Sequence, residues 1–290
     1  MIQGNEKYPI KGTDIQLKRI GFGSMRLSGP GIWGPPKDEH EAIAVLRTAV
    51  DLGVNHIDTA DFYGPHITNQ IIRKALFPYP TDLTIVTKVG YKRTANKDWV
   101  PALSDEELIS AIHDNLRNLD LKTLQIVNLR LSRNDGPDST TLERALKVLL
   151  NLKKKGLIQN VGVSNVTPEQ YAHAAKITSI VCVQNEYNIV SRQDDLFIDV
   201  LDKASVAYVP YFPLGGFQPI QSQILGDIAR QLNATPMQVA IAWLLQHSKN
   251  ILAIPGTSSV THLRENLQAA TLVLPPESLD QLNKLASEEK

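Results

Sequence analysis

Three side chains with complementary chemistry stand at or just after the ends of short apolar runs. Asp58 and Tyr63 lie in the segment VNHIDTADFYG, and Lys88 ends the run LTIVTK. An ammonium group beside a phenol lowers the pKa of the phenol because it favours the phenolate, and a carboxylate beside that ammonium keeps it charged and fixed. The trio can therefore make an acidic phenol, and a phenol tuned in this way can protonate a carbonyl oxygen while hydride arrives at the carbonyl carbon.

Short strand-like runs alternate with longer helix-like segments along the chain. This rhythm is typical of parallel strands joined by helical crossovers. The runs expected to be barrel strands are residues 20–23, 56–58, 84–88, 124–129, 160–164, 181–184, 207–211 and 251–255. The expected helices, in which apolar side chains recur three and four positions apart, include residues 39–52, 105–119, 141–155 and 237–246.

The sequence predicts an α/β fold, a (β/α)8 TIM barrel in which residues 1–290 form a single domain. Residues 7–10 and 15–18 are expected to form a β-hairpin that plugs the N-terminal face, and the tail from residue 275 is expected to add an extra C-terminal helix outside the barrel. Because active sites of TIM barrels lie at the C-terminal ends of the strands, polar residues there are functional candidates. They are Asp58, Lys88, Arg130, Ser164, Asn165, Gln184 and Tyr211.

Seven segments, taken in order, resemble the aldo-keto reductases, a family of NAD(P)H-dependent carbonyl reductases built on a TIM barrel. The resemblance runs from about residue 20 to the C-terminus. It implies that Tyr63 is the catalytic acid, that Lys88 tunes Tyr63 and that Asp58 holds Lys88. The matching segments are GFGSM, IDTADFYG, TKVG, GVSN, VQNEYN, PYFPLGG and IPGTSSVTHLREN.

One catalytic position departs from the family pattern. The family normally has a histidine at the end of the strand after Lys88, where this chain has Arg130 within QIVNLRL. An arginine stays charged at working pH, so Arg130 can stabilise and orient a carbonyl oxygen but cannot pass on a proton. Two interpretations stay open: a reductase suited to a substrate that carries negative charge or a phenolate, and a catalytically weak nucleotide-binding regulatory subunit. The first is favoured because the other three catalytic positions match.

The resemblance also implies a cofactor site. Ser164, Asn165 and Gln184 would meet the nicotinamide carboxamide, and Tyr211 would stack on the nicotinamide ring, as suits amide and aromatic side chains. The implied cofactor residues are Gly23, Ser24, Met25, Ser164, Asn165, Gln184, Tyr211, Pro213, Leu214, Gly256, Thr257, Ser258, His262, Arg264, Glu265 and Asn266.

The last of these segments bears on the choice between NADPH and NADH. Hydroxyls and backbone N–H groups at the start of its helix are expected to meet phosphate. Gly256 and His262 stand where many relatives have a lysine and an arginine that grip the 2′-phosphate of NADP. Arg264 is expected to supply a cation instead, and Glu265 and Asn266 match residues that meet the adenine. NADP is therefore favoured over NAD.

The substrate of this fold is set by loops after the strands. Trp33, Phe62 and Trp99 are candidate walls for a flat ring. Within the family, the strings GPGIWGPP, DFYGPHITNQIIRKAL, VNLR and PLGGF look most like the bacterial pyridoxal reductase branch, which implies reduction of pyridoxal, a small-molecule aldehyde, to pyridoxine with NADPH. A generalist aldehyde or ketone reductase would need nearly the same site. The candidate substrate loops are residues 26–36, 91–101 and 133–139.

Composition and charge argue against several other classes. The 290 residues include 30 basic and 30 acidic side chains, which gives no electrostatic case for nucleic-acid or membrane partners. No apolar run approaches the roughly 20 residues that span a bilayer, and no signal-peptide pattern is present, so a cytoplasmic protein is expected. His56 and His66 lack metal-ligand spacing, so no metal site is expected. Cys182, the only cysteine, is expected to be a buried inert thiol, and the resemblance favours a monomer.

Overall fold

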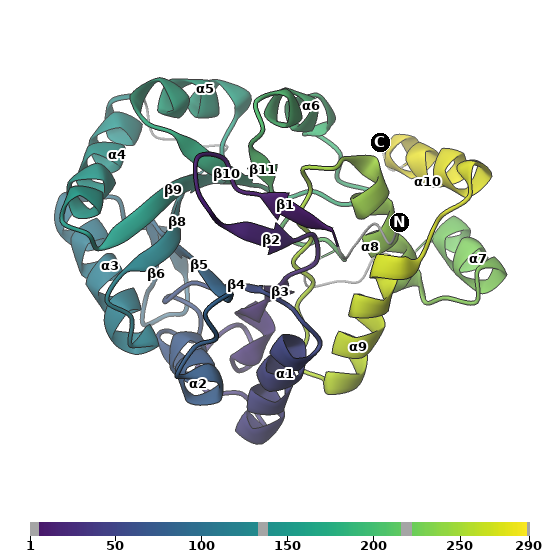
Figure 1. The fold of residues 1–290 in the computed structure, drawn as a ribbon, viewed down its shortest axis with the longest axis horizontal. Coiled ribbons are helices and arrows are strands. Elements are labelled where there is room, and N and C mark those ends of the chain that lie inside the picture. Colours follow the sequence, from purple (N-terminus) through teal and green to yellow (C-terminus); the bar gives the residue numbers. More distant parts are fainter. Residues whose placement is uncertain (1–5, 133–138, 216–221, 289–290) are drawn as a thin grey trace.

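A parallel sheet that curls into a barrel forms the centre of the molecule (Figure 1). The computed structural model describes residues 6–132, 139–215 and 222–288, within which seven strands lie in the spatial order β11-β10-β9-β8-β5-β4-β3. The strands of this sheet are β3 (Phe22–Gly23), β4 (His56–Asp58), β5 (Thr84–Val89), β8 (Leu124–Arg130), β9 (Ile158–Ser164), β10 (Ile180–Gln184) and β11 (Ala207–Tyr208).

The barrel is closed by a short segment near the end of the chain. Ile251 forms a parallel bridge with Tyr208 of β11, and Ala253 forms one with Ile20 just before β3. The eighth strand expected at residues 251–255 is therefore present as isolated bridges rather than as a continuous ladder. With this difference, the expected (β/α)8 barrel is confirmed.

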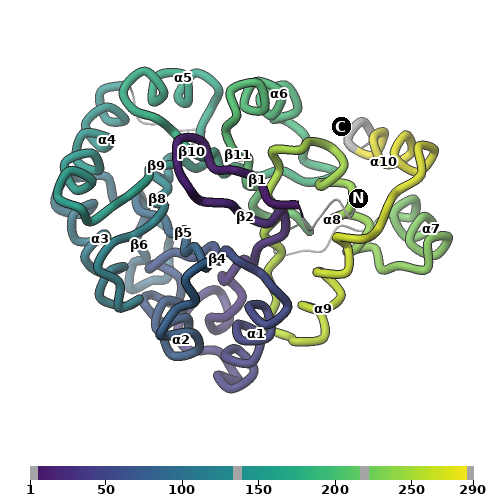
Figure 2. The backbone as a smooth tube through the Cα atoms, viewed as in Figure 1, coloured from purple at the N-terminus to yellow at the C-terminus, as the bar shows by residue number. Residues whose placement is uncertain are grey.

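Helices surround the sheet, and both the ribbon and the tube show them as an outer layer (Figures 1 and 2). Ser104, Thr167 and Thr235 each begin a helix with a capping box, in which the hydroxyl accepts the N3 backbone N–H and the N3 side chain accepts the N-cap N–H. The predicted helix boundaries hold to within two residues. The helices are α1 (Glu39–Asp51), α2 (Ile67–Leu76), α3 (Asp105–Leu119), α4 (Ser139–Lys154), α5 (Pro168–Ile177), α6 (Asp195–Lys203), α7 (Gln223–Gln231), α8 (Pro236–His247), α9 (Val260–Gln268), α10 (Pro276–Glu288) and the 3₁₀ turns η1 (Ser24–Leu27) and η2 (Ala269–Thr271).

The expected N-terminal hairpin covers one end of the barrel. Its strands β1 (Lys7–Pro9) and β2 (Gln16–Lys18) pair antiparallel. The backbone N–H of Lys18 donates to Asn55, directly before β4, which places the hairpin at the N-terminal ends of the strands. Ile10 and Leu17 are buried against apolar side chains of the barrel interior. The plug is therefore confirmed, and the open end of the barrel is the C-terminal one.

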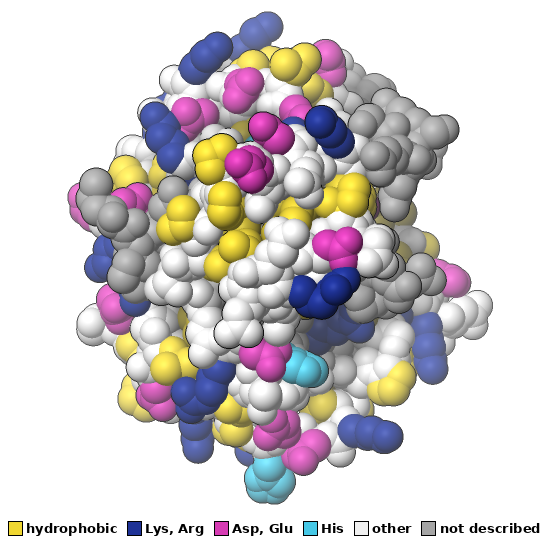
Figure 3. All heavy atoms as spheres, turned by 90° about the vertical axis from the view of Figure 1, so that its right-hand side faces the viewer, with side chains coloured by type: hydrophobic (Ala, Val, Ile, Leu, Met, Phe, Trp, Pro, Cys, Tyr) yellow, Lys and Arg dark blue, Asp and Glu magenta, His cyan; other side chains and the backbone are white. Residues whose placement is uncertain are grey.

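The C-terminal helix agrees with the prediction from the sequence, whereas the segment at residues 91–101 differs from it. The C-terminal helix α10 forms as expected, with Leu282 and Leu285 buried against the core. The predicted loop at residues 91–101 instead contains an antiparallel pair, β6 (Tyr91–Arg93) and β7 (Trp99–Pro101), above the C-terminal end of β5. On the side of the molecule where α7 and α10 lie, basic and acidic side chains are interspersed (Figure 3).

Candidate active site

Asp58 and Lys88 form a buried ion pair at the ends of the neighbouring strands β4 and β5. Lys88 Nζ donates to Asp58 Oδ1 at 2.9 Å and to the carbonyl of Thr59 at 3.0 Å, and it also contacts Asp58 Oδ2. Burial by itself lowers the pKa of Lys88, but the charge of Asp58 and hydrogen bonding to Asp58 and Tyr63 outweigh it, so the pKa is raised. Lys88 therefore stays a cation inside the barrel.

Tyr63 lies beside this pair, as the sequence predicted. The centroid of the Tyr63 ring is 5.2 Å from Lys88 Nζ, and the side chain of Tyr63 is buried. Edge-to-face contacts join Tyr63 to Phe62, with centroids 5.3 Å apart, and to Trp99, with centroids 6.4 Å apart. The phenol is thus held by aromatic side chains on one side and faces a cation on the other.

Gln184 adds an amide to the same cluster. Its Nε2 donates to Asp58 Oδ1 at 2.7 Å, so Asp58 orients both Lys88 and Gln184. The other amide atom of Gln184, Oε1, is buried and has no hydrogen-bond partner within the described part of the chain. A buried carbonyl without a donor is costly, so this oxygen is a candidate acceptor for a ligand group. This orphaned acceptor fits the NH₂ group of a nicotinamide carboxamide.

Arg130 reaches the same mouth from β8. Its Nη1 donates to Ser164 Oγ at 3.2 Å, and its guanidinium carbon lies 4.9 Å from the ring of Tyr211 and 5.6 Å from that of Tyr91. No carboxylate among the described residues forms an ion pair with it. Within the described part of the chain, two rings and a hydroxyl therefore hold the cation.

The open end of the barrel is hollowed into a pocket of about 660 Å³. This volume is ample for a small substrate together with part of a nucleotide. It brings most of the predicted site residues together. Those that line it are Gly23, Ser24, Met25, Asp58, Phe62, Tyr63, Lys88, Trp99, Arg130, Tyr211, Pro213, Leu214, Gly256, Thr257, Ser258, His262, Glu265 and Asn266.

Three predicted cofactor residues lie just beneath this lining. Ser164 and Gln184 are fully buried under Arg130 and Asp58. Asn165 accepts a hydrogen bond from the hydroxyl of Tyr211 at 3.1 Å, which fixes that ring at the wall of the pocket.

Two predicted residues lie elsewhere. Arg264 lines a separate pocket of about 350 Å³ together with Lys18. The reason is helical phase: His262 and Glu265 are three apart on α9 and share a face, whereas Arg264 is turned away from it. Trp33 is also absent from the lining of the main pocket, and its ring stacks instead against the guanidinium of Arg93 at 5.3 Å.

Arg93 was not predicted from the sequence. It connects the loop at residues 26–36 to the β6–β7 hairpin beside the site. Its guanidinium donates to the carbonyls of Gly31, Ile32 and Lys97 and lies 4.2 Å from the ring of Trp99. No spacing in the sequence indicates this contact, because it depends on the unpredicted β6–β7 hairpin. Among the residues that line the pocket, Arg26, Ile32 and Tyr91 lie in the candidate substrate loops 26–36 and 91–101, although none was singled out. The lining residues that were missed are Phe212, Thr235, Met237 and Ile254.

The predicted loop residues 133–138 lie outside the described residues. Within the part of the chain that is described, no group of histidine, cysteine, aspartate and glutamate side chains has the arrangement of a metal site. Nor does any helix there have the length and apolar character needed to cross a membrane.

The chain is similar to known proteins in sequence and in fold. The profile of the Aldo/keto reductase family matches residues 19–287. Pyridoxine 4-dehydrogenase of Escherichia coli (strain K12) is 58% identical over 274 residues, covering 94% of this chain and 96% of that protein. An uncharacterised oxidoreductase of Schizosaccharomyces pombe is 34% identical over 98% of this chain and 91% of its own length.

Solved structures agree with the sequence comparison. The crystal structure of the thermostable aldo-keto reductase Tm1743 with the inhibitor epalrestat superposes with a TM-score of 0.82 at 29% identity, covering 96% of this chain and 99% of the other. A Klebsiella pneumoniae aldo/keto reductase solved with NADP and acetate shares the fold, with a TM-score of 0.79 at 24% identity, covering 97% and 95%. With the family profile spanning nearly the whole length, the chain belongs to the aldo/keto reductase family.

Proposed function

We propose that the protein is an NADPH-dependent carbonyl reductase, that its substrate is a small aromatic aldehyde, and that this aldehyde is pyridoxal. The observation that carries the proposal is the buried Lys88–Asp58 pair beside Tyr63 at the floor of the large pocket. The 58% identity to pyridoxine 4-dehydrogenase supports the choice of substrate.

Tyr63 acts as the proton donor in this proposal. When bound, NADPH supplies hydride to the carbonyl carbon. Tyr63 gives its hydroxyl proton to the carbonyl oxygen, and Lys88, kept charged by Asp58, stabilises the phenolate that remains. The barrel interior excludes water around the pair, so the attraction between ammonium and phenolate acts in a medium of low dielectric.

The residues present fit the cofactor. The orphaned Gln184 Oε1, the neighbouring Ser164 and Asn165, and the ring of Tyr211 would hold the nicotinamide. At the far end of the pocket Thr257, Ser258 and His262, with Glu265 and Asn266, would hold the adenosine and its phosphates. A Klebsiella pneumoniae relative crystallised with NADP supports this choice of nucleotide.

Arg130 favours an anionic ring over a neutral one. Pyridoxal carries a phenolate beside its aldehyde, and the guanidinium of Arg130 lines the pocket between the rings of Tyr91 and Tyr211. Phe62 and Trp99 form an aromatic wall on the Tyr63 side, with ring centroids 5.7 Å apart. A flat aldehyde that carries a phenolate would therefore meet both a cation and a stacking surface.

The test is the loss of NADPH absorbance when pyridoxal is added to the purified protein, run beside NADH and a neutral aromatic aldehyde. Fast oxidation of NADPH with pyridoxal, and slower oxidation in the other two mixtures, is expected. Equal rates with both aldehydes would identify a generalist reductase. Binding of NADPH without oxidation by any aldehyde would refute the proposal and favour a nucleotide-binding regulatory subunit.

A further inference from the structure

A buried polar network lies directly behind the proposed catalytic residues. Successive residues of a strand face opposite sides, so Asp58 and Lys88 point into the barrel while Thr59 and Thr87 point outward to the helices. Asp61, two residues before Tyr63, joins the same layer. Each of the three proposed catalytic residues is thus one or two positions from a member of this outer network.

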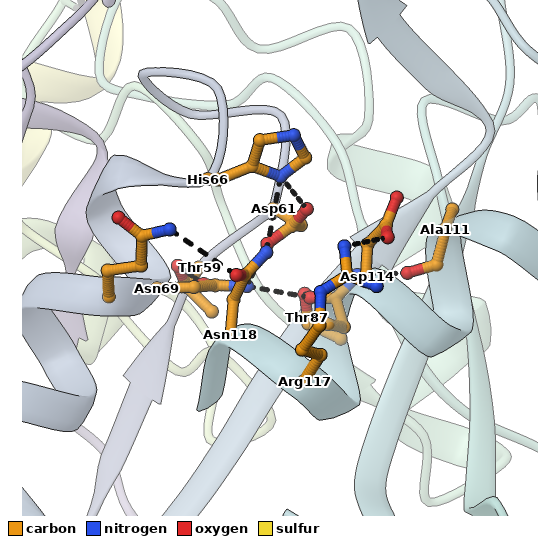
Figure 4. A network of polar contacts seen from close by, with 11 residues as sticks. Thr59, Asp61, His66, Asn69, Thr87, Ala111, Asp114, Arg117 and Asn118 are labelled. Atoms are coloured by element: carbon orange, nitrogen blue, oxygen red, sulfur yellow. Dashed lines mark hydrogen bonds and ion pairs between the residues drawn. The ribbon is translucent and has the colours of Figure 1, made fainter. Parts of the chain in front are cut away.

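Asp61 is the centre of the network (Figure 4). Its Oδ1 accepts hydrogen bonds from the side-chain amides of Asn69 at 3.0 Å and Asn118 at 2.8 Å, and its Oδ2 lies 2.6 Å from His66 Nδ1. The carboxylate thereby ties the loop that carries Tyr63 to α2 and α3. The backbone carbonyl of Asp61 also accepts the N–H of His66 at 2.6 Å.

The network extends from Asp61 to the ends of β4 and β5, the strands that carry Asp58 and Lys88. Thr59 donates to Asn69 Oδ1 at 2.8 Å, and Asn69 donates in turn to Asn115 Oδ1 at 3.0 Å. Thr87 donates to the same oxygen of Asn115 at 2.5 Å, and the amide of Asn115 donates to the carbonyl of Ala111. A continuous chain of hydrogen bonds therefore connects the neighbours of Asp58, Tyr63 and Lys88.

The burial of this network argues for a geometric role. The side chains of Thr59, Asn69, Thr87 and Asn115 are fully buried, and Asp61 is 6% exposed. Apolar side chains usually fill the layer between a sheet and its helices. Directional hydrogen bonds fix orientation more narrowly than apolar packing does, while they add little net stability.

His66 faces Asp61 and, from α3, Asp114 and Arg117. The hydrogen bond with Asp61 is the largest cause of a raised pKa of His66, opposed by partial burial. From α3, Asp114 raises this pKa further and Arg117 lowers it. With a hydrogen on Nδ1, His66 donates to Asp61 Oδ2, and the carboxylate then has a donor on each oxygen.

We propose that Asp61, through this network, is a positioning residue that sets Tyr63 against Lys88. The proposal rests on the proposed reductase function, because it concerns the placement of its acid. Removing the carboxylate breaks the contacts of the loop at residues 59–63 with Asn118 of α3 and with the amide of Asn69 of α2, so the phenol samples orientations away from the ammonium. The cofactor end of the pocket lies on other elements and is expected to keep its affinity.

The test compares Asp61→Val and Asp61→Asn with a matched control, Asn250→Ala. Asn250 is also fully buried and donates to the carbonyls of Val206 and Ile198, but at the plugged end of the barrel. Asp61→Val is expected to lower kcat for pyridoxal at least tenfold and to change the dissociation constant of NADPH by less than twofold. Asp61→Asn, which keeps one acceptor oxygen, is expected to recover part of kcat. The control is expected to lose melting temperature but not kcat.

A second readout does not need turnover. In protein labelled at its tyrosine rings, the resonance of Tyr63 is assigned by its absence in Tyr63→Phe, and Asp61→Val is expected to move this resonance while Asn250→Ala leaves it in place. A resonance unmoved by Asp61→Val, or a kcat within twofold of the wild type, would overturn the proposal. Parallel losses of kcat and NADPH affinity would also overturn it, because they indicate a purely structural network. Wild-type protein that reduces no aldehyde would refute the proposed function alone, and the resonance would still decide the role of Asp61.

Discussion

Replacing Lys88 by methionine tests how much the buried charge of Lys88 contributes to stability, because the replacement changes the shape of the side chain little. Methionine fills a similar volume, but it removes the ammonium that donates to Asp58 and to the carbonyl of Thr59. The side chains of Lys88 and Asp58 are 3% and 5% exposed, so water cannot replace the lost partner. Asp58 would remain as a buried carboxylate with Gln184 as its remaining donor.

The size of the effect follows from this burial. Removing one partner of a buried ion pair costs about 3–5 kcal/mol, because the other charge is left uncompensated. We expect Lys88→Met to lower the free energy of unfolding by this amount at neutral pH. The double variant Asp58→Asn/Lys88→Met contains neither charge and is expected to recover about 2 kcal/mol or more of the loss.

Urea unfolding followed by tryptophan fluorescence measures these free energies by linear extrapolation. A loss below about 1 kcal/mol for Lys88→Met would refute the reasoning, since it would resemble that of an exposed pair. Strict additivity of the two single variants would refute it as well, because coupling between the charges is what the double variant removes.

The Lys88–Asp58 pair also predicts how the stability of the folded protein changes with pH. The folded-state pKa of Lys88 is raised above its ordinary value of 10.5, so charging this group favours the folded state. Its contribution to stability is complete below the ordinary value and is lost as pH rises through the folded-state pKa. We expect the advantage of the wild type over the double variant to be constant at neutral pH and to shrink in strong alkali. An advantage that grew with pH would contradict the raised pKa.

Three further substitutions probe the pocket. Tyr63→Phe is expected to lower kcat by about 10²–10⁴ while NADPH affinity stays nearly unchanged, and an equally fast variant would remove Tyr63 as the acid. Arg130→His is expected to lower turnover of pyridoxal more than that of a neutral aldehyde, and equal losses would contradict the match between Arg130 and an anionic substrate. Arg93→Met releases the ring of Trp99 and is expected to raise KM for the aldehyde several-fold, whereas a weakened affinity for NADPH instead would place Arg93 with the cofactor.

The charged part of the site could be predicted because it depends on strand ends. Asp58 and Lys88 end runs whose burial and length identify them as parallel strands, and the strands β4 and β5 are neighbours in the sheet. In such a barrel the C-terminal ends of adjacent strands meet at one mouth, whatever the loops do. The orphaned oxygen of Gln184 could not be predicted in the same way, because it depends on which amide atom faces Asp58.

The walls of the site escaped prediction because they depend on contacts between loops. Arg93 joins Gly31 and Ile32 to Trp99 across about sixty positions of sequence, and no periodicity records such a contact. Arg264 is a different case. Its spacing of two residues from His262 turns it to another face of a helix, so the sequence itself contains the reason that the two side chains line different pockets.

The hairpin at the closed end of the barrel bears on the chemistry at the open end. Ile10 and Leu17 of the plug share a small void of about 10 Å³ with His56 and Asp58, so apolar atoms lie directly beneath the ion pair. Burial lowers the pKa of His56 to about 4, which leaves this ring neutral at working pH and adds no competing cation. The apolar side chains beneath the pair lower the local dielectric constant, which strengthens the attraction between Asp58 and Lys88. The plug therefore adds to the burial that by itself lowers the pKa of Lys88, and also to the attraction of Asp58 that outweighs this effect, although its residues precede the first barrel strand.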